Sequence, residues 1–283
     1  MAIIIDGKKL AIELSEECAE RVQSLKNDGI DPRLDVVIVG DDPASHQYVN
    51  SRMKDCTDIG LTSKTHVLSG DIEQRELTDL LDKLCADDAV HGIILQMPLP
   101  KHMDQDDVLS HIRPEKDVDG LTVLNAGALF TGRQGFAPCT PSSIMQLVRS
   151  VGVPIKGKNA VVVGRSIVVG KPAAMLLLAE HATVTVCHSR TENLKAHLQN
   201  ADIIVAAVGV PNLITGDMIK PGAIIVDAGI NRVDGKTVGD VEFASAEKVA
   251  GYISPVPGGV GPVTRKILLS NTLTAAERAN GRR

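Results

Sequence analysis

The sequence lacks the patterns that mark disulfide frameworks and zinc sites. Its 283 residues contain five cysteines without a Cys-x-x-Cys pair, and its eight histidines form no His-Glu-x-x-His spacing. Such pairs and spacings are the usual signatures of these structures. We therefore expect reduced, packed cysteines, a cytoplasmic protein and no bound metal.

Basic stripes and long hydrophobic runs are also lacking. The formal net charge is −5, whereas nucleic-acid-binding proteins usually carry a basic stripe. A membrane helix needs roughly 18 apolar residues, and the apolar run at residues 3–5 is also too short for a signal peptide. We expect a small-molecule partner, with neither nucleic acid nor membrane bound.

What the chain does contain is an alternation of short β-branched runs with longer amphipathic runs. This alternation is typical of βαβ units with a parallel sheet. Because domains usually span about 100–200 residues, a chain of this length predicts two of them. The expected strands are residues 36–39, 92–96, 159–163, 183–187, 203–206 and 223–226.

The helices follow from cap residues and apolar spacing. Asp42 and Pro43 predict the start of a helix that stops before Gly60. Residues 113–140 are expected to be rich in loops, and the last helix to pack back on the first domain. The other expected helices lie around residues 77–84, 142–151, 170–180, 192–199, 217 and 263–279.

A dinucleotide signal lies at residues 161–172. A strand ends at Gly164, and Gly170 opens a helix whose free N–H groups suit a diphosphate. The pattern is not Gly-x-Gly-x-x-Gly, and a tight turn in a domain that binds nothing would also produce it. The next strand ends in His188-Ser189-Arg190-Thr191 without the carboxylate that holds the ribose of NAD. With Arg165, this favours NADP, although Arg190 also fits a solvated loop charge.

Polar side chains also mark the first half. Tyr48 and Arg52 are spaced i,i+4 beside an apolar stripe, so they share a helix face; Lys54 points elsewhere. They fit a cleft wall, or equally a surface cation beside a half-buried ring. Gln96 ends a strand, where open α/β sheets bind ligands, but it also fits a hydrogen bond to its own loop. Asp119 precedes a glycine, as turn residues do.

Six motifs together resemble the methylenetetrahydrofolate dehydrogenase/cyclohydrolase family over nearly the whole chain. They are Pro43-Ala44-Ser45 leading to Tyr48-Val49, Gln96-Met97-Pro98-Leu99-Pro100, Lys116-Asp117-Val118-Asp119-Gly120, Pro138-Cys139-Thr140-Pro141, Val163-Gly164-Arg165-Ser166 with Val169-Gly170, and Pro255-Val256-Pro257-Gly258-Gly259-Val260-Gly261-Pro262.

The resemblance implies an N-terminal α/β catalytic domain, a Rossmann-like NADP-binding domain and a cleft between them. We expect the catalytic domain at residues 1–140, completed by helix 263–283, and the NADP domain at 141–262. The implied reactions are oxidation of 5,10-methylenetetrahydrofolate with NADP⁺ and hydrolysis of the methenyl product to 10-formyltetrahydrofolate. Homodimers are usual in the family.

The resemblance also implies roles for individual residues. The implied catalytic residues are Tyr48, Arg52, Gln96 and Asp119. Folate contacts are Tyr48, Gln96, Pro98, Asp119, Pro257, Gly258 and Gly259. NADP contacts are Gly164, Arg165, Ser166, Ser189 and Ile230.

One position departs from the family pattern Tyr-x-x-x-Lys, because Arg52 replaces the catalytic lysine. Arginine does not release its proton in proteins, so we expect the hydrolytic step to be weakened. A monofunctional dehydrogenase and a non-catalytic NADP-binding sensor remain alternatives. A shikimate-type dehydrogenase would leave the Gln96 and Pro257 motifs unexplained.

Overall fold

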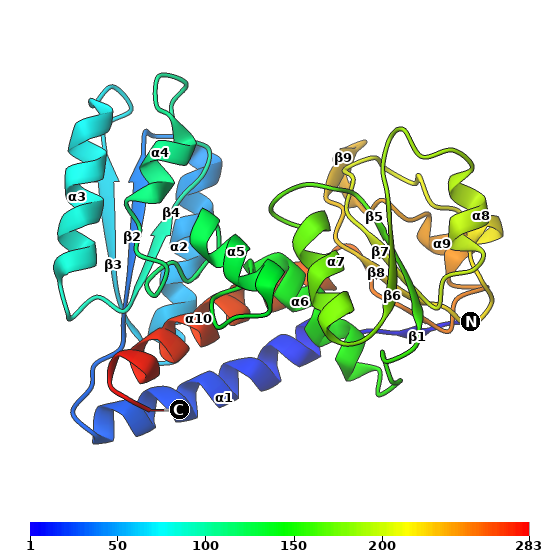
Figure 1. Ribbon diagram of the computed structural model, residues 1–283, viewed down its shortest axis with the longest axis horizontal. Helices are drawn as coiled ribbons and strands as arrows, with labels where there is room; N and C mark the ends of the chain where they lie inside the picture. The colour runs from blue at the N-terminus through cyan, green and yellow to red at the C-terminus, as the bar shows by residue number, and fades with distance from the viewer. Residues whose placement is uncertain (283) are drawn as a thin grey trace. The chain divides into compact units, whose positions relative to one another are not determined.

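The computed structural model describes residues 1–282, apart from the side chain of Ala44. The chain forms two compact units, one from Met1–Ile12 with Pro138–Thr264 and the other from Glu13–Ala137 with the chain from Arg265 onward. We call them the six-stranded unit and the three-stranded unit after their sheets. Helices α1 (Gly7–Asn27) and α10 (Val260–Ala279) each supply residues to both units (Figure 1).

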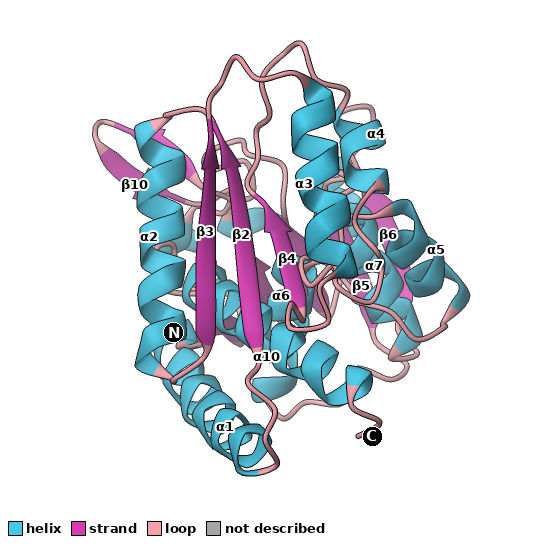
Figure 2. Cartoon of the chain, turned by 90° about the vertical axis from the view of Figure 1, so that its left-hand side faces the viewer, coloured by secondary structure: helices cyan, strands magenta, loops and turns pink. Residues whose placement is uncertain are grey.

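The three-stranded unit is built on a parallel sheet in the order β3-β2-β4 (Figure 2). Alternate side chains of the central strand, Val37 and Val39, pack with Leu77 and Leu81 of α3. The strand is buried on both faces, as expected of a central parallel strand. The elements are β2 (Arg33–Val39), α2 (Pro43–Asp58), β3 (Thr62–Leu68), α3 (Gln74–Ala86), β4 (Gly92–Leu95), α4 (Gln105–Ser110) and α5 (Val123–Thr131).

The six-stranded unit has a parallel sheet in the order β1-β11-β8-β7-β5-β6 and a separate hairpin, β9-β10. Its central strands β7 and β8 are completely buried. The elements are β1 (Ile3–Ile4), α6 (Cys139–Ser150), β5 (Asn159–Val163), α7 (Gly170–Ala179), β6 (Thr183–Cys187), α8 (Leu194–Leu198), β7 (Ile203–Ala206), η1 (Gly216–Met218), β8 (Ile224–Asp227), β9 (Asn231–Val233), β10 (Lys236–Val238), α9 (Phe243–Ala246) and β11 (Tyr252–Ile253).

Local chemistry sets the ends of α2 as predicted. The Asp42 side chain accepts a hydrogen bond from the backbone N–H of Ser45, and Pro43 opens the helix. Gly60, with φ of +75°, ends it in the left-handed region that glycine adopts most readily. These caps set the two ends of the helix that carries Tyr48 and Arg52.

Residues 113–140 are less irregular than predicted, because they contain α5. The Thr122 hydroxyl accepts from the N–H of Asn125, and Gly132 closes the helix with φ of +66°. The prediction of a loop-rich region over residues 113–140 therefore missed this helix. The helix exposes Val123, Leu124 and Phe130, so it lacks the amphipathic spacing on which the prediction depended.

The C-terminal part of α10 packs against α1 within the three-stranded unit. The Arg21 guanidinium donates to both carboxylate oxygens of Glu277, at 2.9 and 2.8 Å, and also to Ser270 and Thr274. Bidentate pairs of this kind fix orientation as well as proximity. Helices from the two ends of the chain are thereby joined.

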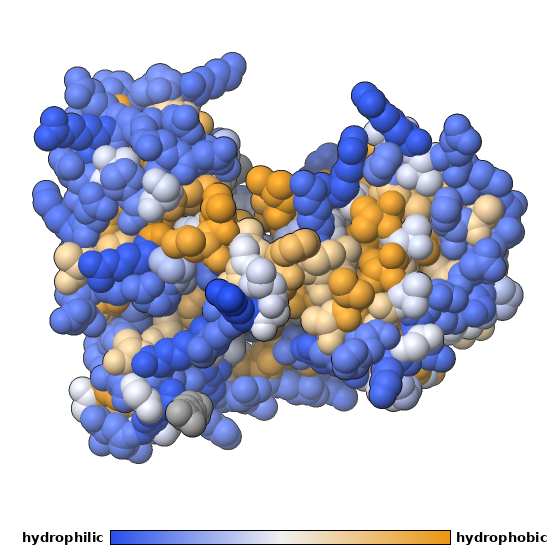
Figure 3. Space-filling model, viewed as in Figure 1, coloured by the Kyte–Doolittle hydropathy of each residue, from blue (hydrophilic) through white to orange (hydrophobic). Residues whose placement is uncertain are grey.

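On the face drawn in Figure 3, hydrophobic patches lie between mainly hydrophilic residues. Within residues 1–282, no helix combines the length and the apolar character needed to cross a bilayer. All five cysteines are free and buried.

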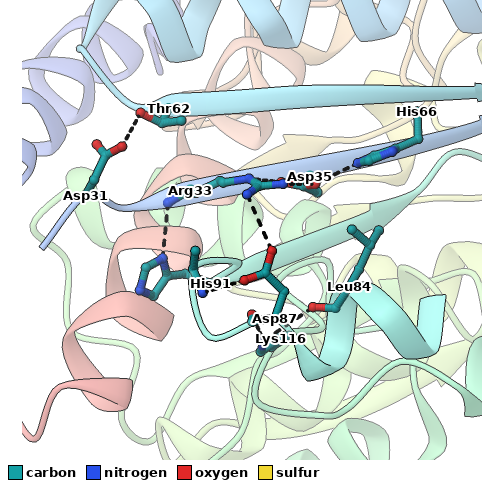
Figure 4. Close-up of polar contacts among 10 residues, drawn as sticks. Asp31, Arg33, Asp35, Thr62, His66, Leu84, Asp87, His91 and Lys116 are labelled. Atoms are coloured by element: carbon teal, nitrogen blue, oxygen red, sulfur yellow. Dashed lines mark hydrogen bonds and ion pairs between the residues drawn. The ribbon is translucent and has the colours of Figure 1, made fainter. Parts of the chain in front are cut away.

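A buried carboxylate stabilises the amino-terminal end of the three-stranded sheet (Figure 4). Asp35 of β2 is 0% exposed. It accepts two hydrogen bonds from Arg33, at 2.7 and 2.8 Å, and lies 2.7 Å from the His66 ring on β3. Removing one partner of a buried pair leaves an uncompensated charge, which costs about 3–5 kcal/mol.

We predict that Arg33→Met lowers the free energy of unfolding by about 3 kcal/mol, since His66 remains to compensate Asp35 in part. Urea unfolding followed by circular dichroism measures the change. The control is Arg75→Met, because Arg75 is 86% exposed with its Asp79 partner 4.0 Å away; it should shift stability by less than about 0.5 kcal/mol. Equal effects of the two variants would contradict the role given to Arg33.

Candidate functional site

Arg52 and Gln96 meet at the carboxyl end of β4. The Arg52 guanidinium Nη1 donates to Gln96 Oε1 at 2.7 Å, and Gln96 Nε2 donates to the carbonyl of Met97 at 2.7 Å. The Gln96 amide therefore uses its oxygen to bind Arg52 and its nitrogen to bind its own loop. The two contacts occur together and do not exclude each other. Tyr48, one turn before Arg52 on α2, is 54% exposed. This face of α2 offers a half-buried cation and an accessible ring.

Asp55 continues the same face of α2 toward the core. The positions of Tyr48, Arg52 and Asp55 fall within about 60° on a helix of 3.6 residues per turn. Asp55 is 7% exposed, and its carboxylate lies 2.8 Å from Lys266 Nζ and 3.2 Å from an Arg265 guanidinium nitrogen. These two cations of α10 fix the deeper end of the helix that carries Arg52.

Lys54 is directed away from this face, as predicted. Its ammonium pairs with Asp58 on the exposed side of α2, at 2.7 Å, and its side chain is 75% exposed. Lys54 therefore does not replace the family's lysine beside Gln96.

The loop between α4 and α5 contains a buried aspartate, Asp117, and a more accessible one, Asp119. Asp117 is 2% exposed and accepts from the N–H groups of Leu121 and Thr122 and from the Asn125 amide. Asp117 therefore holds the backbone of this loop. Asp119 is half-buried and Pro98 is exposed, so both present surface for a ligand on this side of the unit.

In the six-stranded unit, the turn after β5 is a cradle of backbone. Gly164 has φ of +131°, and a Cβ there would collide with the carbonyl of Ala207. A Cβ on Gly170 would collide with the Gly164 carbonyl. Ser166 Oγ accepts from the N–H groups of Val169 and Gly170, at 3.1 and 3.2 Å. Ser166 thus engages the N–H groups at the start of α7 and holds the helix N-terminus against the turn.

The predicted nucleotide contacts around this turn are accessible. Arg165, Ser166 and Ser189 are exposed, and Ile230 is 67% exposed. The segment from His188 to Thr191 forms a compact turn in which the His188 N–H donates to Thr191 Oγ1 at 2.8 Å. It carries no carboxylate, so its charge suits an anion.

The glycine-rich segment before α10 is tightly packed in the six-stranded unit. A Cβ on Gly259 would approach the carbonyl of Pro255 and the side chain of Ser254. A Cβ on Gly7 of α1 would in turn collide with the Gly259 carbonyl. Pro257 is exposed, and Gly258 has φ of +113°. The segment is therefore a firmly held loop with one accessible edge.

Two buried aspartates that the sequence analysis missed lie at the carboxyl end of this sheet. Asp227 ends β8 and accepts from the N–H groups of Gly229, Asp240 and Val241. Asp240 accepts from the N–H groups of Val208 and Gly209 and from the Asn231 amide. Burial is the largest effect on Asp227 and raises its pKa to about 6, and nearby Asp240 acts in the same direction. The only sequence signal was an aspartate directly after an apolar run.

The two units together define a class of protein. A parallel sheet with a glycine turn at a helix start is typical of nucleotide-binding α/β domains. Polar and cationic side chains at the strand ends of a second unit are typical of an enzyme that acts on a small molecule. Among the described residues, no group of three or more histidine, cysteine or carboxylate side chains is placed to hold a metal ion. The class is therefore a two-domain, nucleotide-dependent α/β enzyme.

Comparison with known families gives the particular member of this class. Residues 5–119 match the catalytic domain of tetrahydrofolate dehydrogenase/cyclohydrolase, and residues 138–280 match its NAD(P)-binding domain. The chain belongs to the tetrahydrofolate dehydrogenase/cyclohydrolase family. The predicted family and fold class are confirmed, and the shikimate-type alternative is set aside.

Similar proteins span nearly the whole chain. The bifunctional protein FolD of Moorella thermoacetica is 54% identical, over 98% of this chain and 99% of its own. The crystal structure of the Campylobacter jejuni FolD dehydrogenase/cyclohydrolase is 45% identical with a TM-score of 0.96, over 98% and 99% of the two chains. The Trypanosoma brucei enzyme, complexed with NADP cofactor and an inhibitor, is 40% identical with a TM-score of 0.92, over 99% and 98%.

The raised pKa of Asp227 predicts a specific pH dependence of stability. Because the native state binds this proton more tightly than the unfolded chain, the stabilisation is complete below about pH 4 and is lost as the pH rises through about 6. The free energy of unfolding of the wild type, minus that of Asp227→Asn, should fall by up to about 3 kcal/mol across this window. Urea unfolding at a series of pH values measures it, and a flat difference would refute the shift.

Proposed function

We propose that this protein oxidises 5,10-methylenetetrahydrofolate with NADP⁺ and hydrolyses the 5,10-methenyl product to 10-formyltetrahydrofolate, with Arg52 limiting the second step. The observation that carries the proposal is the Arg52–Gln96 hydrogen bond of 2.7 Å, on the same face of α2 as Tyr48, in a member of this family. When bound, NADP⁺ accepts the hydride that leaves the methylene carbon.

In this proposal the folate-binding domain is residues 1–140, completed by helix 263–283, and its folate contacts are Tyr48, Gln96, Pro98 and Asp119. Tyr48 stacks along the pterin and aminobenzoate region, and Asp119 holds the pterin ring. The further folate contacts Pro257, Gly258 and Gly259 come from residues 141–262. The exposed ring of Tyr48 and the accessible edge of Pro257 support this assignment. Gln96 also holds the Arg52 guanidinium in position, in addition to its proposed contact with the substrate.

The NADP side belongs to residues 141–262. Its contacts are Gly164, Arg165, Ser166, Ser189 and Ile230. The backbone cradle at Gly164 and Gly170 leaves no room for side chains, so it fits a diphosphate that approaches the main chain closely. The exposed cation of Arg165, and the absence of a carboxylate at residues 188–191, fit the 2′-phosphate of NADP.

Arg52 affects the two reactions differently. Hydride transfer depends mainly on holding two rings face to face, and a fixed cation is compatible with it. Attack of water on the methenyl carbon releases a proton, which a group near Arg52 has to accept. A guanidinium stays charged at every working pH and cannot do so. The hydrolytic step therefore loses a contribution that general bases typically make, about 10²–10⁴-fold.

A homodimer in the cytoplasm completes the proposal. Strand β3 is an edge strand of the three-stranded sheet, and its Val67 is 59% exposed. Edge strands of this kind pair readily with another chain, which supports a dimer built through this edge. The five free cysteines, all buried as thiols, support a reducing compartment.

The first experiment follows NADPH and the methenyl intermediate together after mixing the protein with methylenetetrahydrofolate and NADP⁺, with a no-enzyme control for spontaneous hydrolysis. We expect NADPH to rise while the methenyl species accumulates, and NAD⁺ to give a lower rate. NADPH without accumulation would mean that both steps run and that Arg52 does not limit hydrolysis. Binding of NADP⁺ without turnover would favour the sensor alternative.

We predict that Arg52→Lys raises the cyclohydrolase rate at least about 10-fold, because an amine can exchange its proton. The dehydrogenase rate should stay within about threefold, since the cation beside Gln96 is retained. The matched control is Lys54→Arg, on the exposed side of the same helix, which should change neither rate. Unchanged hydrolysis in a folded Arg52→Lys enzyme would count against Arg52 as the limiting group.

A further inference from the structure

The two buried carboxylates at the carboxyl end of the six-stranded sheet are not part of the predicted site. We propose that Asp240, supported by Asp227, is a positioning residue for hydride transfer: it holds the loops after β7 and β8 on which the nicotinamide end of the cofactor lies. The inference rests on the proposed dehydrogenase function and deepens it. It assigns these two aspartates to the dehydrogenase step and not to the cyclohydrolase step.

Asp240 joins two loops through a single carboxylate. Its Oδ2 accepts from the backbone N–H groups of Val208 and Gly209, at 2.7 and 3.0 Å, directly after β7. Its Oδ1 accepts from the Asn231 side-chain amide at 2.9 Å, at the start of β9. Asn231 is next to Ile230, the predicted cofactor contact. Since Asp240 is 0% exposed, solvent does not compete for these bonds.

The loop that Asp240 holds also forms one wall of the dinucleotide turn. Ala207 precedes Val208, and its N–H donates to the carbonyl of Val163 at 2.8 Å. The Ala207 carbonyl lies where a side chain on Gly164 would be. A shift of residues 207–209 would therefore displace the Gly164 turn, which would hold the diphosphate of a bound cofactor.

Asp227 fixes the position of Asp240 itself. Its Oδ1 accepts from the Asp240 N–H at 3.1 Å and from the Gly229 N–H at 2.8 Å, and its Oδ2 accepts from the Val241 N–H at 2.8 Å. A Cβ on Gly229 would collide with the Asp240 carboxylate, and one on Gly239 with that of Asp227. These two glycines leave room for the carboxylates, so the loops and aspartates form one packed unit.

This arrangement separates the two reactions. Hydride transfer requires a narrow range of distances between the nicotinamide and the methylene carbon. A displacement of about 1 Å can lower the rate about 100-fold. Hydrolysis of methenyltetrahydrofolate needs no hydride acceptor. A change at Asp240 should therefore affect the dehydrogenase selectively, whereas a loss of folded protein would affect both activities alike.

The test compares Asp240→Asn with the isosteric control Asp234→Asn in the exposed β9–β10 turn. All partners of Asp240 are N–H donors, so either orientation of the new amide turns an NH₂ group toward a donor. We expect dehydrogenase kcat/KM for NADP⁺ to fall about 10–100-fold. The isotope effect with deuterated methylene substrate should rise, because hydride transfer becomes slower. Hydrolysis of supplied methenyltetrahydrofolate should stay within about twofold.

A second variant covers the case in which Asp240→Asn does not fold. Asn231→Ala removes one donor to Asp240 at a half-buried position, and it should show the same selective loss at about 3–10-fold. Equal losses of both activities in either folded variant, or an unchanged dehydrogenase, would overturn the proposal. If the wild type and Asp234→Asn lack dehydrogenase activity as well, the proposed function fails instead, which separates the two outcomes.

Discussion

The six-stranded unit depends on the satisfaction of backbone N–H groups where its parallel strands end. Strands β7 and β8 are completely buried, so the loops that follow them begin away from water. Buried N–H groups without partners are costly. The carboxylates of Asp227 and Asp240 accept five backbone hydrogen bonds in this region. Two residues thereby give several short loops a single conformation, beside the turn that fits the cofactor.

The three-stranded unit uses charge differently at its own strand ends. Arg52 is half-buried and its guanidinium is held by a neutral amide, Gln96, while Asp55 one turn deeper is neutralised by α10. The Arg52 cation beside the proposed folate site is therefore fixed in place by Gln96, and the carboxylate of Asp55 is paired with α10 instead. A lysine and an arginine differ little as point charges there. They differ in whether the charge can be removed, and only one of the two proposed reactions depends on that.

Much of this organisation could be predicted from the sequence because it depends on local chemistry. The ends of α2 follow from Asp42, Pro43 and Gly60, and the central strands follow from their apolar runs. Helix α5 was missed because its apolar residues face solvent, and the roles of Asp227 and Asp240 because tertiary packing creates them. The contact between Arg52 and Gln96 joins residues 44 positions apart. The helix face of Arg52 and the strand end at Gln96 could each be predicted from the sequence. That these two residues are in contact depends on how α2 packs on the sheet, which the sequence pattern does not show.

The way the two ends of the chain are used has a consequence for synthesis. Strand β1 pairs only with β11 among the described strands, and Arg21 of α1 pairs with Glu277 of α10. During synthesis, residues 1–27 emerge well before β11 and α10, which supply these partners. The pairing of β1 with β11 and of Arg21 with Glu277 can therefore form only after the central strands have been translated. Because both units include residues of α10, a chain truncated before this helix lacks part of each unit.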